Sequence, residues 1–471
     1  MRRKIAFICV VISLLYSCKK DEVDEKVNTT LPERFFAQLS NIDLLEFDLA
    51  IDKNDDIYVS GTTSAMTEGA DLDFGGVILK AGGNRDAFIV KYDQAGKVLW
   101  AKLLGDNSQE NGLTVGVDHD ENVYVACRFR DSTTIEGTKF KTKTLRNSSG
   151  IPNWDDLLLV KLDKNGKHTW TKQISGVGFE TLSSIEISED GKIFVSGEFY
   201  QSIYFDKITY NVNGSAFFVA CYNPTGELGW AKTYGADHGL SPWGDIYSSN
   251  MKLSRDGKII IAGSFEGQKK IEQTMLNSNG DQDIFITKLD RQGRVEWVKT
   301  FGSVGTENCR GLSIDEDGNI SIGGFFRGPL ILGPYSFKTP TASGDAILAK
   351  FNSTGSLIWA SQITGNEDEY IYDLVARKSK LYTVGYFGSV GYFGDSTLQG
   401  QRYTNTFFAE YTDSGKFEKV QTLGSYSARG RRILVDRKDF TIVLGYFGSP
   451  YTFNNSVYAN KSVNDIFLVK F

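Results

Sequence analysis

The stretch Asp86–Phe129, DAFIVKYDQAGKVLWAKLLGDNSQENGLTVGVDHDENVYVACRF, decides the fold. It contains four short apolar runs, each bounded by polar turn residues. In the turn Asp93–Gly96, the Asp can accept hydrogen bonds from the backbone ahead of it, and the Gly can take the left-handed conformation that closes a hairpin. These runs and turns predict four β-strands.

The same pattern returns along the whole chain. A strand that ends in a small residue, one further residue and often Phe occurs seven times, about every 60 to 70 residues. The copies are IYVSGTT (57–63), VYVACRF (123–129), IFVSGEF (193–199), IIIAGSF (259–265), ISIGGFF (320–326), LYTVGYF (381–387) and TIVLGYF (441–447). A continuously apolar strand follows each copy, and the strand after the next tight turn carries an aromatic residue at one shared position. These residues are Trp100, Trp170, Trp230, Trp297, Trp359 and Phe417.

Four strands per repeat at this spacing predict the blades of an all-β propeller. The chain enters this pattern at Arg34–Leu39, which matches the fourth strand of a blade, and it stops at Phe471 after a third strand. We therefore expect the N-terminal strand to pair with the C-terminal strand and close the ring, which removes open sheet edges. Six internal units and one shared blade predict a seven-bladed β-propeller of four-stranded blades over residues 34–471.

The N-terminus has the features of a bacterial export signal. Three basic residues, Arg2 to Lys4, precede an apolar run over 5–16, which is shorter than the roughly 20 residues of a membrane-spanning helix. The segment Leu15–Cys18 resembles the lipobox of bacterial lipoproteins. This resemblance implies a signal peptide over 1–17, lipidation of Cys18 and a solvated tether over 18–33. The alternative is an ordinary secretory signal with an incidental cysteine.

The residues after Cys18 indicate where in the cell the protein is located. Lys19–Glu22 resembles the surface-export signal of Bacteroidota lipoproteins. This resemblance implies an outer-membrane lipoprotein that is exposed at the cell surface and held to the membrane by its lipid alone. The net charge of −6 argues against nucleic acid as a partner, because nucleic-acid binding needs a basic footprint.

The remaining cysteines and acidic turns do not indicate a metal site. Cys127, Cys221 and Cys309 lie far apart, and each falls in or beside a predicted strand. Asp315 and Asp317 could begin a calcium loop, but the loop lacks the terminal Glu that such a site requires, so we expect a hairpin turn. We expect no metal, no cofactor and a monomeric propeller domain.

The repeat resembles that of the SBBP proteins, a family named for seven-bladed propellers, over residues 34–471. The matching positions in one unit are Trp297, Gly302, Gly305, Glu307, Asp315, Gly318, Asn319 and Gly324. The resemblance implies the propeller fold and often a location outside the cytoplasm, but no shared catalytic residue. A weaker similarity links Asp93, Gly96 and Trp100 to quinoprotein repeats. Quinoprotein dehydrogenases also need calcium ligands and typically eight blades, and the sequence indicates neither.

Long, variable connections are expected on one side of the propeller, where binding usually resides. They span residues 64–84, 131–154, 201–214, 267–282, 328–344, 388–404 and 448–464, and several have the rhythm of small extra hairpins. Two tryptophans, Trp154 and Trp243, fall on this side next to Asp155 and Asp245. An exposed Trp beside a carboxylate can stack on a sugar ring and bond its hydroxyls, which makes these four residues candidate glycan contacts. Aromatic caps over the blade ends are the alternative.

An acidic residue recurs before the first strand of several blades. The recurring residues are Glu110, Glu180, Glu307 and Glu369. They would ring the mouth of the central channel if their side chains point inward, where they could hold a cation. Their recurrence favours a structural bond to the backbone of a neighbouring blade.

The sequence contains none of the common catalytic motifs. There is no Gly-x-Ser-x-Gly, HExxH or phosphate-cradling loop. The three histidines, His119, His168 and His238, fall in different segments. We expect a non-catalytic, lipid-anchored propeller that binds a glycan or a partner protein through its long-loop side. The alternative is a propeller enzyme that acts on polysaccharide or a quinone-dependent oxidoreductase.

Overall fold

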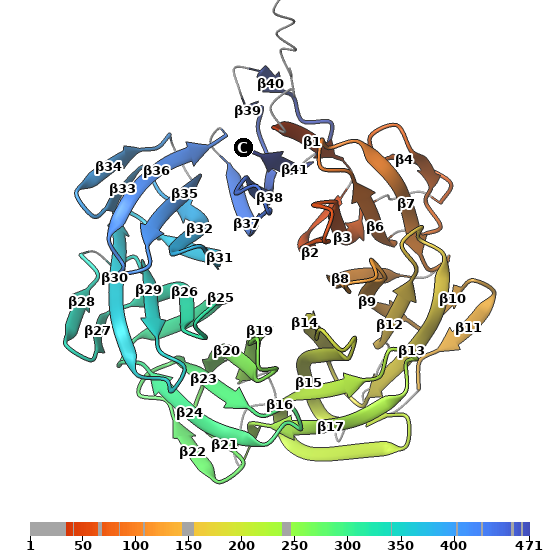
Figure 1. Cartoon of the computed structure of the whole chain (residues 1–471), viewed down its shortest axis with the longest axis horizontal. Helices are drawn as coiled ribbons and strands as arrows, with labels where there is room; N and C mark the ends of the chain where they lie inside the picture. The colour runs from red at the N-terminus through yellow and green to blue at the C-terminus, as the bar shows by residue number, and fades with distance from the viewer. Residues whose placement is uncertain are drawn as a thin grey trace, which may run out of the picture. The chain divides into compact units, whose positions relative to one another are not determined.

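The computed structural model (Figure 1) describes residues 34–40, 42–64, 68–83, 85–106, 109–143, 155–237, 246–340, 342–401, 404–424, 427–453, 456–462 and 465–471. Arg34–Phe471 form one compact unit. The described part of this unit consists of strands and turns without a helix. A helix long and apolar enough to cross a membrane is therefore absent from these residues.

The repeated unit is a four-stranded antiparallel meander. One example consists of β31 (Tyr370–Arg377), β32 (Lys380–Phe387), β35 (Asn405–Thr412) and β36 (Phe417–Leu423), which pair in that order. The two middle strands are buried almost throughout, whereas most residues of β36 are partly or fully exposed. The continuously apolar runs of the sequence are thus the middle strands, as predicted, because other sheets cover both of their faces.

The same meander occurs in further sheets along the chain. These are β2 (Ile42–Ile51), β3 (Ile57–Thr63), β6 (Ala87–Tyr92), β7 (Val98–Leu104); β8 (Glu110–Val117), β9 (Val123–Arg130), β12 (Asp155–Leu162), β13 (His168–Gly176); β14 (Glu180–Ile187), β15 (Ile193–Phe205), β16 (Ile208–Tyr222), β17 (Leu228–Tyr234); β19 (Ile246–Leu253), β20 (Ile259–Phe265), β23 (Asp283–Leu289), β24 (Val295–Phe301); and β25 (Thr306–Ile314), β26 (Ile320–Arg327), β29 (Asp345–Phe351), β30 (Leu357–Gly365). Pairing of β13 with β15 joins two of these meanders into one eight-stranded sheet.

The last sheet contains strands from both ends of the described chain. It consists of β37 (Ala428–Val435), β38 (Thr441–Phe447), β41 (Asp465–Lys470) and β1 (Phe35–Leu39). β1 runs antiparallel to β41, with Phe35 opposite Lys470 and Leu39 opposite Ile466. The inner strands contact one another in the order β2, β8, β14, β19, β25, β31 and β37, and β37 also contacts β2. Figure 1 shows them facing a common centre, so the fold is an all-β propeller.

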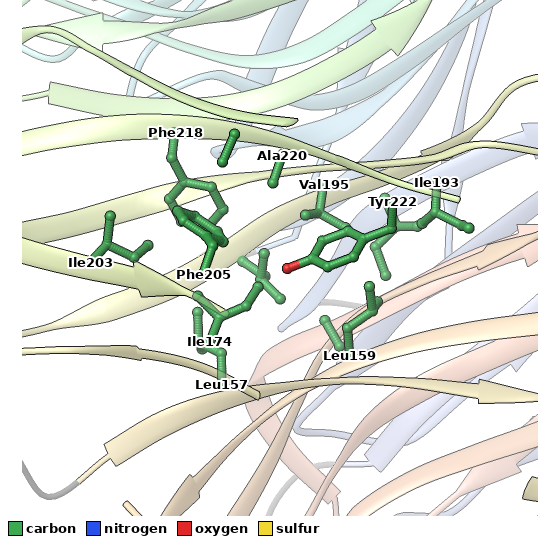
Figure 2. Packing of buried hydrophobic residues seen from close by; sticks show 14 of the residues in the cluster. Leu157, Leu159, Ile174, Ile193, Val195, Ile203, Phe205, Phe218, Ala220 and Tyr222 are labelled. Atoms are coloured by element: carbon green, nitrogen blue, oxygen red, sulfur yellow. The ribbon is translucent and has the colours of Figure 1, made fainter. Parts of the chain in front are cut away.

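Neighbouring sheets pack face to face through apolar side chains. Figure 2 shows Leu157 and Ile174 of one meander beside Phe205 and Phe218 of the next, all fully buried. Full burial of such side chains contributes about 1.5–3 kcal/mol each. The core is therefore divided among the interfaces between sheets.

The predicted extra hairpins are present in the long connections. They are β4 (Asp71–Asp73) with β5 (Ile78–Lys80), β10 (Ser132–Ile135) with β11 (Thr138–Lys141), β21 (Gln268–Ile271) with β22 (Thr274–Asn277), β27 (Pro329–Leu332) with β28 (Tyr335–Lys338), β33 (Val390–Phe393) with β34 (Ser396–Gln399), and β39 (Tyr451–Phe453) with β40 (Ser456–Tyr458). The β33–β34 hairpin pairs with the last strand of the preceding sheet, where Phe393 lies opposite Ile363 of β30. The β21–β22 hairpin pairs with β18 (Ala236–Asp237), a short strand that follows β17. The long connections thus reinforce the joints between sheets.

The recurring tryptophans connect each outer strand to the following sheet. The indole Nε1–H of Trp359 donates to the Asp413 carbonyl (2.9 Å), and Gly415 of the same turn lies against the ring. Trp100 and Trp170 make the same bond to Lys164 and Pro224. The shared position is therefore explained by packing between sheets.

Candidate functional site

The predicted tryptophan site lies mostly beyond the described residues. Trp154, Trp243 and Asp245 are outside them, so a glycan contact there stays a prediction. Asp155 begins β12, and its carboxylate accepts a hydrogen bond from Arg130 Nε (2.9 Å).

The recurrent glutamates do not open onto a channel mouth. Glu110, Glu180, Glu307 and Glu369 are each 2 % exposed or less. The Ser303 backbone N–H and hydroxyl donate to the Glu307 carboxylate at 2.9 and 2.7 Å, and the Gly178 N–H donates to Glu180 at 3.1 Å. These bonds place the carboxylates beneath the connections that join one sheet to the next. The donors Ser303 and Gly178 belong to these connecting loops themselves.

Each glutamate has a buried aspartate at one constant separation before it in the sequence. The pairs are Asp86 and Glu110, Asp156 and Glu180, Asp283 and Glu307, and Asp345 and Glu369. The aspartate lies within one residue of the start of the third strand of one sheet, and the glutamate within one residue of the start of the first strand of the next. Burial, reinforced by the aspartate charges, raises the pKa of Glu110 to about 8, of Glu307 to about 7 and of Glu369 to about 9. Sequence reasoning found the glutamates but missed these partners, although the constant separation was visible.

The acidic turn that could have been a calcium loop is a hairpin turn. Asp315 Oδ1 accepts the N–H groups of Asp317 (3.0 Å) and Asn319 (2.8 Å). Its other oxygen is 2.7 Å from Lys350 Nζ, so a protein cation already neutralises the carboxylate. No cluster of three or more metal-ligating side chains occurs in the described ranges.

The inner strands surround a polar cavity of about 370 Å³. Six of them have a one-residue register shift near their start, and in five of these the residue after the shift lines the cavity. These five residues are Thr114, Ser184, Asn250, Asp373 and Arg432. The bulges explain how strands with buried faces can present polar side chains to the axis.

The charged groups of the cavity are engaged with one another or with backbone. Arg432 Nε lies 2.8 Å from Asp48 Oδ1, and Lys252 Nζ lies 2.6 Å from Glu186 Oε1. Asp373 accepts the N–H groups of Leu374 (2.9 Å) and Ile433 (3.0 Å). Burial raises the pKa of Asp373 to about 6, although nearby Arg432 lowers it. The cavity is a polar joint between inner strands.

A cluster of aromatic and guanidinium groups lies where the long connections leave β25–β26, β31–β32 and β37–β38. We call it the mouth patch. It comprises Arg310, Phe325, Tyr370, Tyr372, Tyr386, Arg429, Arg431 and Tyr446. Arg310 is exposed, and Tyr372 is buried, while the other members are partly exposed. The patch is therefore a surface that a partner can reach.

The rings of the mouth patch stack on one another across two sheets. Phe325 stacks on Tyr370 with ring centroids 5.4 Å apart, and Tyr370 stacks on Tyr372 at 4.8 Å. The Tyr370 hydroxyl donates to Asn308 Oδ1 of the neighbouring sheet. Burial raises the pKa of Tyr370 to about 12 against the opposing effect of Arg310. The rings are thus held in place before any partner binds.

The guanidinium groups lie over these rings. The guanidinium carbon of Arg431 is 4.0 Å from the Tyr372 ring centroid and 5.5 Å from that of Tyr446. The corresponding distance from Arg429 to Tyr386 is 4.8 Å. Within the described part of the chain, no carboxylate forms an ion pair with Arg310, Arg429 or Arg431. Arg310 hydrogen-bonds with the Tyr370 side chain and Arg429 with that of Tyr372, and the remaining guanidinium N–H groups can bind an external acceptor.

The sheets outside the mouth patch carry different residues at the equivalent positions. The middle residue of the Gly–x–Phe landmark is Phe325, Tyr386 or Tyr446 in the patch, but elsewhere it is polar: Thr62, Arg128, Glu198 and Ser264. Arg128 has a carboxylate nearby, with Asp155 Oδ2 at 4.0 Å. Sequence reasoning used this landmark only to define the repeat. The run of aromatics at its variable middle position was the signal that could have revealed the patch.

The described residues offer no arrangement typical of nucleophilic catalysis. Cys127, Cys221 and Cys309 are free and buried, and burial raises the pKa of the Cys309 thiol to about 12. His119 is exposed on a short turn beside Asp120, whereas the His168 ring contacts the Thr171 hydroxyl on an outer strand. Neither imidazole lies beside a cysteine thiol, so the mouth patch is the strongest candidate site.

Comparison with known proteins finds distant relatives and no family. No family model matches the chain. An uncharacterized WD repeat-containing protein of Acanthamoeba polyphaga mimivirus is 23 % identical over 453 residues, which cover 80 % of this chain and 32 % of that protein. The regulatory protein FlaEY of Caulobacter vibrioides is 24 % identical over 216 residues, covering 44 % of this chain and 20 % of that protein. The chain thus spans about a third or less of the length of the curated relatives it matches. The WD40 β-propeller domain of Doa1 aligns over 92 % of this chain and 95 % of that domain, with 10 % identity and a TM-score of 0.41.

Proposed function

We propose that this protein is a non-catalytic binding or scaffold propeller that docks a partner on its long-loop side, at the mouth patch. The observation that carries the proposal is the set of guanidinium groups stacked on a fixed tyrosine cluster, without a carboxylate partner among the described residues. Arg and Tyr side chains are enriched at binding hot spots. Similarity to a WD repeat-containing protein also supports a scaffold role.

We also propose that the scaffold is a closed ring of seven four-stranded blades of the SBBP type. The supports are the pairing of β1 with β41 and the contact of β37 with β2. A ring closed by its own termini holds each sheet between two neighbours. Such rigidity lowers the entropic cost of presenting residues from three sheets to one partner.

We further propose that the propeller is held at the outer membrane by a lipid on Cys18 and faces the cell exterior. The supports are the Leu15–Cys18 segment and the charged run after it. Incorporation of labelled palmitate into the wild-type protein, and its loss in a Cys18→Ser variant, tests the anchor. Equal labelling of both proteins would reject it.

Site-specific photo-crosslinking in cells of the native host tests the docking surface. A photoreactive amino acid replaces the exposed Arg310 of the mouth patch, and a matched control places it at His119, whose side chain is 82 % exposed on a short turn. We expect a defined crosslinked partner from position 310 and none from position 119. Crosslinks of equal yield and identity at both positions, or at 119 alone, would reject the long-loop side as the docking surface.

A further inference from the structure

We propose that the partner of the mouth patch is an acidic segment of a protein, whose carboxylates are bound by Arg310, Arg429 and Arg431. This inference rests on the proposed function and adds the chemistry of the partner. It follows from three features of the patch: its ring faces are covered, its guanidinium groups have no carboxylate partner among the described residues, and its members are spread over three sheets.

The ring faces of the patch are already covered by other side chains of the patch. Tyr370 stacks between Phe325 and Tyr372, and the faces of Tyr372 and Tyr386 carry the guanidinium groups of Arg431 and Arg429. A sugar ring needs an open aromatic face on which to stack. The guanidinium groups of the patch remain for a partner, which favours a charged acceptor over a glycan.

The donors of the patch fit carboxylates. A guanidinium presents its N–H groups in a planar fork that matches a carboxylate with two parallel bonds. Stacking on Tyr372 and Tyr446 restricts the orientation of Arg431, so less side-chain freedom is lost when an acceptor binds. Arg429 and Arg431 are also partly buried, which weakens solvent screening of a pair formed there.

The spread of the donors indicates an extended partner. Arg310 lies on β25, whereas Arg429 and Arg431 lie on β37, and β31 with its tyrosines lies between these strands. A single small anion would reach one end of this row. A peptide with several Asp or Glu side chains can reach both ends and pass over the hydroxyl groups of the intervening tyrosines.

Fluorescence anisotropy of labelled probes on the purified propeller tests the inference. The probes are an Asp/Glu decapeptide, its Asn/Gln counterpart and an oligogalacturonate, which carries carboxylates on sugar rings. We expect the acidic decapeptide to bind most tightly and to weaken as salt rises. An R429Q/R431Q double variant should lose at least about tenfold in affinity, because arginines at binding hot spots contribute on that scale. The matched control K164Q/K167Q removes two exposed cations from a short turn and should change affinity less than about twofold.

The R429K/R431K variant distinguishes a loss of binding from a folding defect. It keeps both charges and should keep the wild-type melting temperature, but it should bind the acidic peptide more weakly because lysine lacks the planar fork. Tighter binding of the oligogalacturonate, equal binding of the neutral peptide, or equal losses in the two glutamine variants would each overturn the inference. A crosslink at position 310 to a partner without acidic segments would overturn it while leaving the proposed docking function intact.

Discussion

Arg432 Nε lies 2.8 Å from Asp48 Oδ1, although 384 residues separate them in the chain. The second oxygen of Asp48 accepts the Thr114 hydroxyl (2.6 Å) and the Val115 N–H (3.2 Å). One carboxylate therefore connects β37, β2 and β8, which are inner strands of three different sheets. The contact between the first and last inner strands depends on polar bonds as well as on apolar packing.

We expect Asp48→Ala to destabilise the propeller by about 2–4 kcal/mol, because it leaves Arg432 and two other donors without their acceptor. The urea midpoint measures the effect. Asp120→Ala is the matched control, since that side chain is 85 % exposed and its loss should cost less than about 0.5 kcal/mol. Equal midpoints for the two variants would show that Asp48 does not join the strands.

The packing of Trp359 against the next turn predicts a position-specific glycine effect. Gly415 has φ +82°, and a Cβ there would lie 2.5 Å from Trp359 Cδ2. Gly137 has φ +78° with nothing within 4 Å, so Gly137→Ala measures the backbone cost alone, about 1 kcal/mol. We expect Gly415→Ala to cost about 1–3 kcal/mol more in thermal unfolding. Equal costs would mean that the indole moves aside freely.

The N-terminal strand should be held by its aromatic contacts. Phe36 stacks on Tyr458 with centroids 3.7 Å apart and lies 5.3 Å from Tyr451. Since large-to-small changes in packed sites lose both burial and contacts, Phe36→Ala should cost about 2–4 kcal/mol by urea unfolding. Leu99→Ala is the control, because that side chain is 47 % exposed and should cost less than about 1 kcal/mol. Resistance of residues 34–40 to proteolysis should fall only in the Phe36 variant.

Much of the fold could be predicted because its signals are local and repeated. The apolar runs, the Asp-to-Gly turns and the Trp position each recur at a fixed place, and each corresponds to one strand, hairpin or joint. The extra hairpins were predicted from the same rhythm. Their pairing with the preceding sheet, as between Phe393 and Ile363, was not, because it depends on the angle between sheets.

The candidate site was less predictable for a related reason. Glu110 and Asp86 belong to different sheets, and only the fold brings these two carboxyls under one connection. The mouth patch likewise combines residues of β25, β31 and β37, and a bulge in each of these strands changes the direction in which its side chains point. A search for tryptophans beside acids therefore led to Trp154 and Trp243, while the variable middle residue of each repeat held the more informative pattern.

The buried glutamates predict an unusual pH dependence of stability. Burial raises the pKa of Glu369 to about 9, so the folded state keeps a proton that the unfolded chain releases near its usual pKa of about 4.3. The stabilisation is therefore complete below about pH 4 and is lost progressively as the pH rises toward about 9. We expect the urea midpoint of the wild-type protein to fall over this range.

Glu369→Gln should make the decline shallower, because an amide stays neutral and can still accept the Gly388 N–H bond. The control Glu316→Gln alters a side chain that is 69 % exposed and should leave the slope unchanged. Parallel profiles for the wild type and Glu369→Gln would show that Glu369 is ionised in the folded propeller.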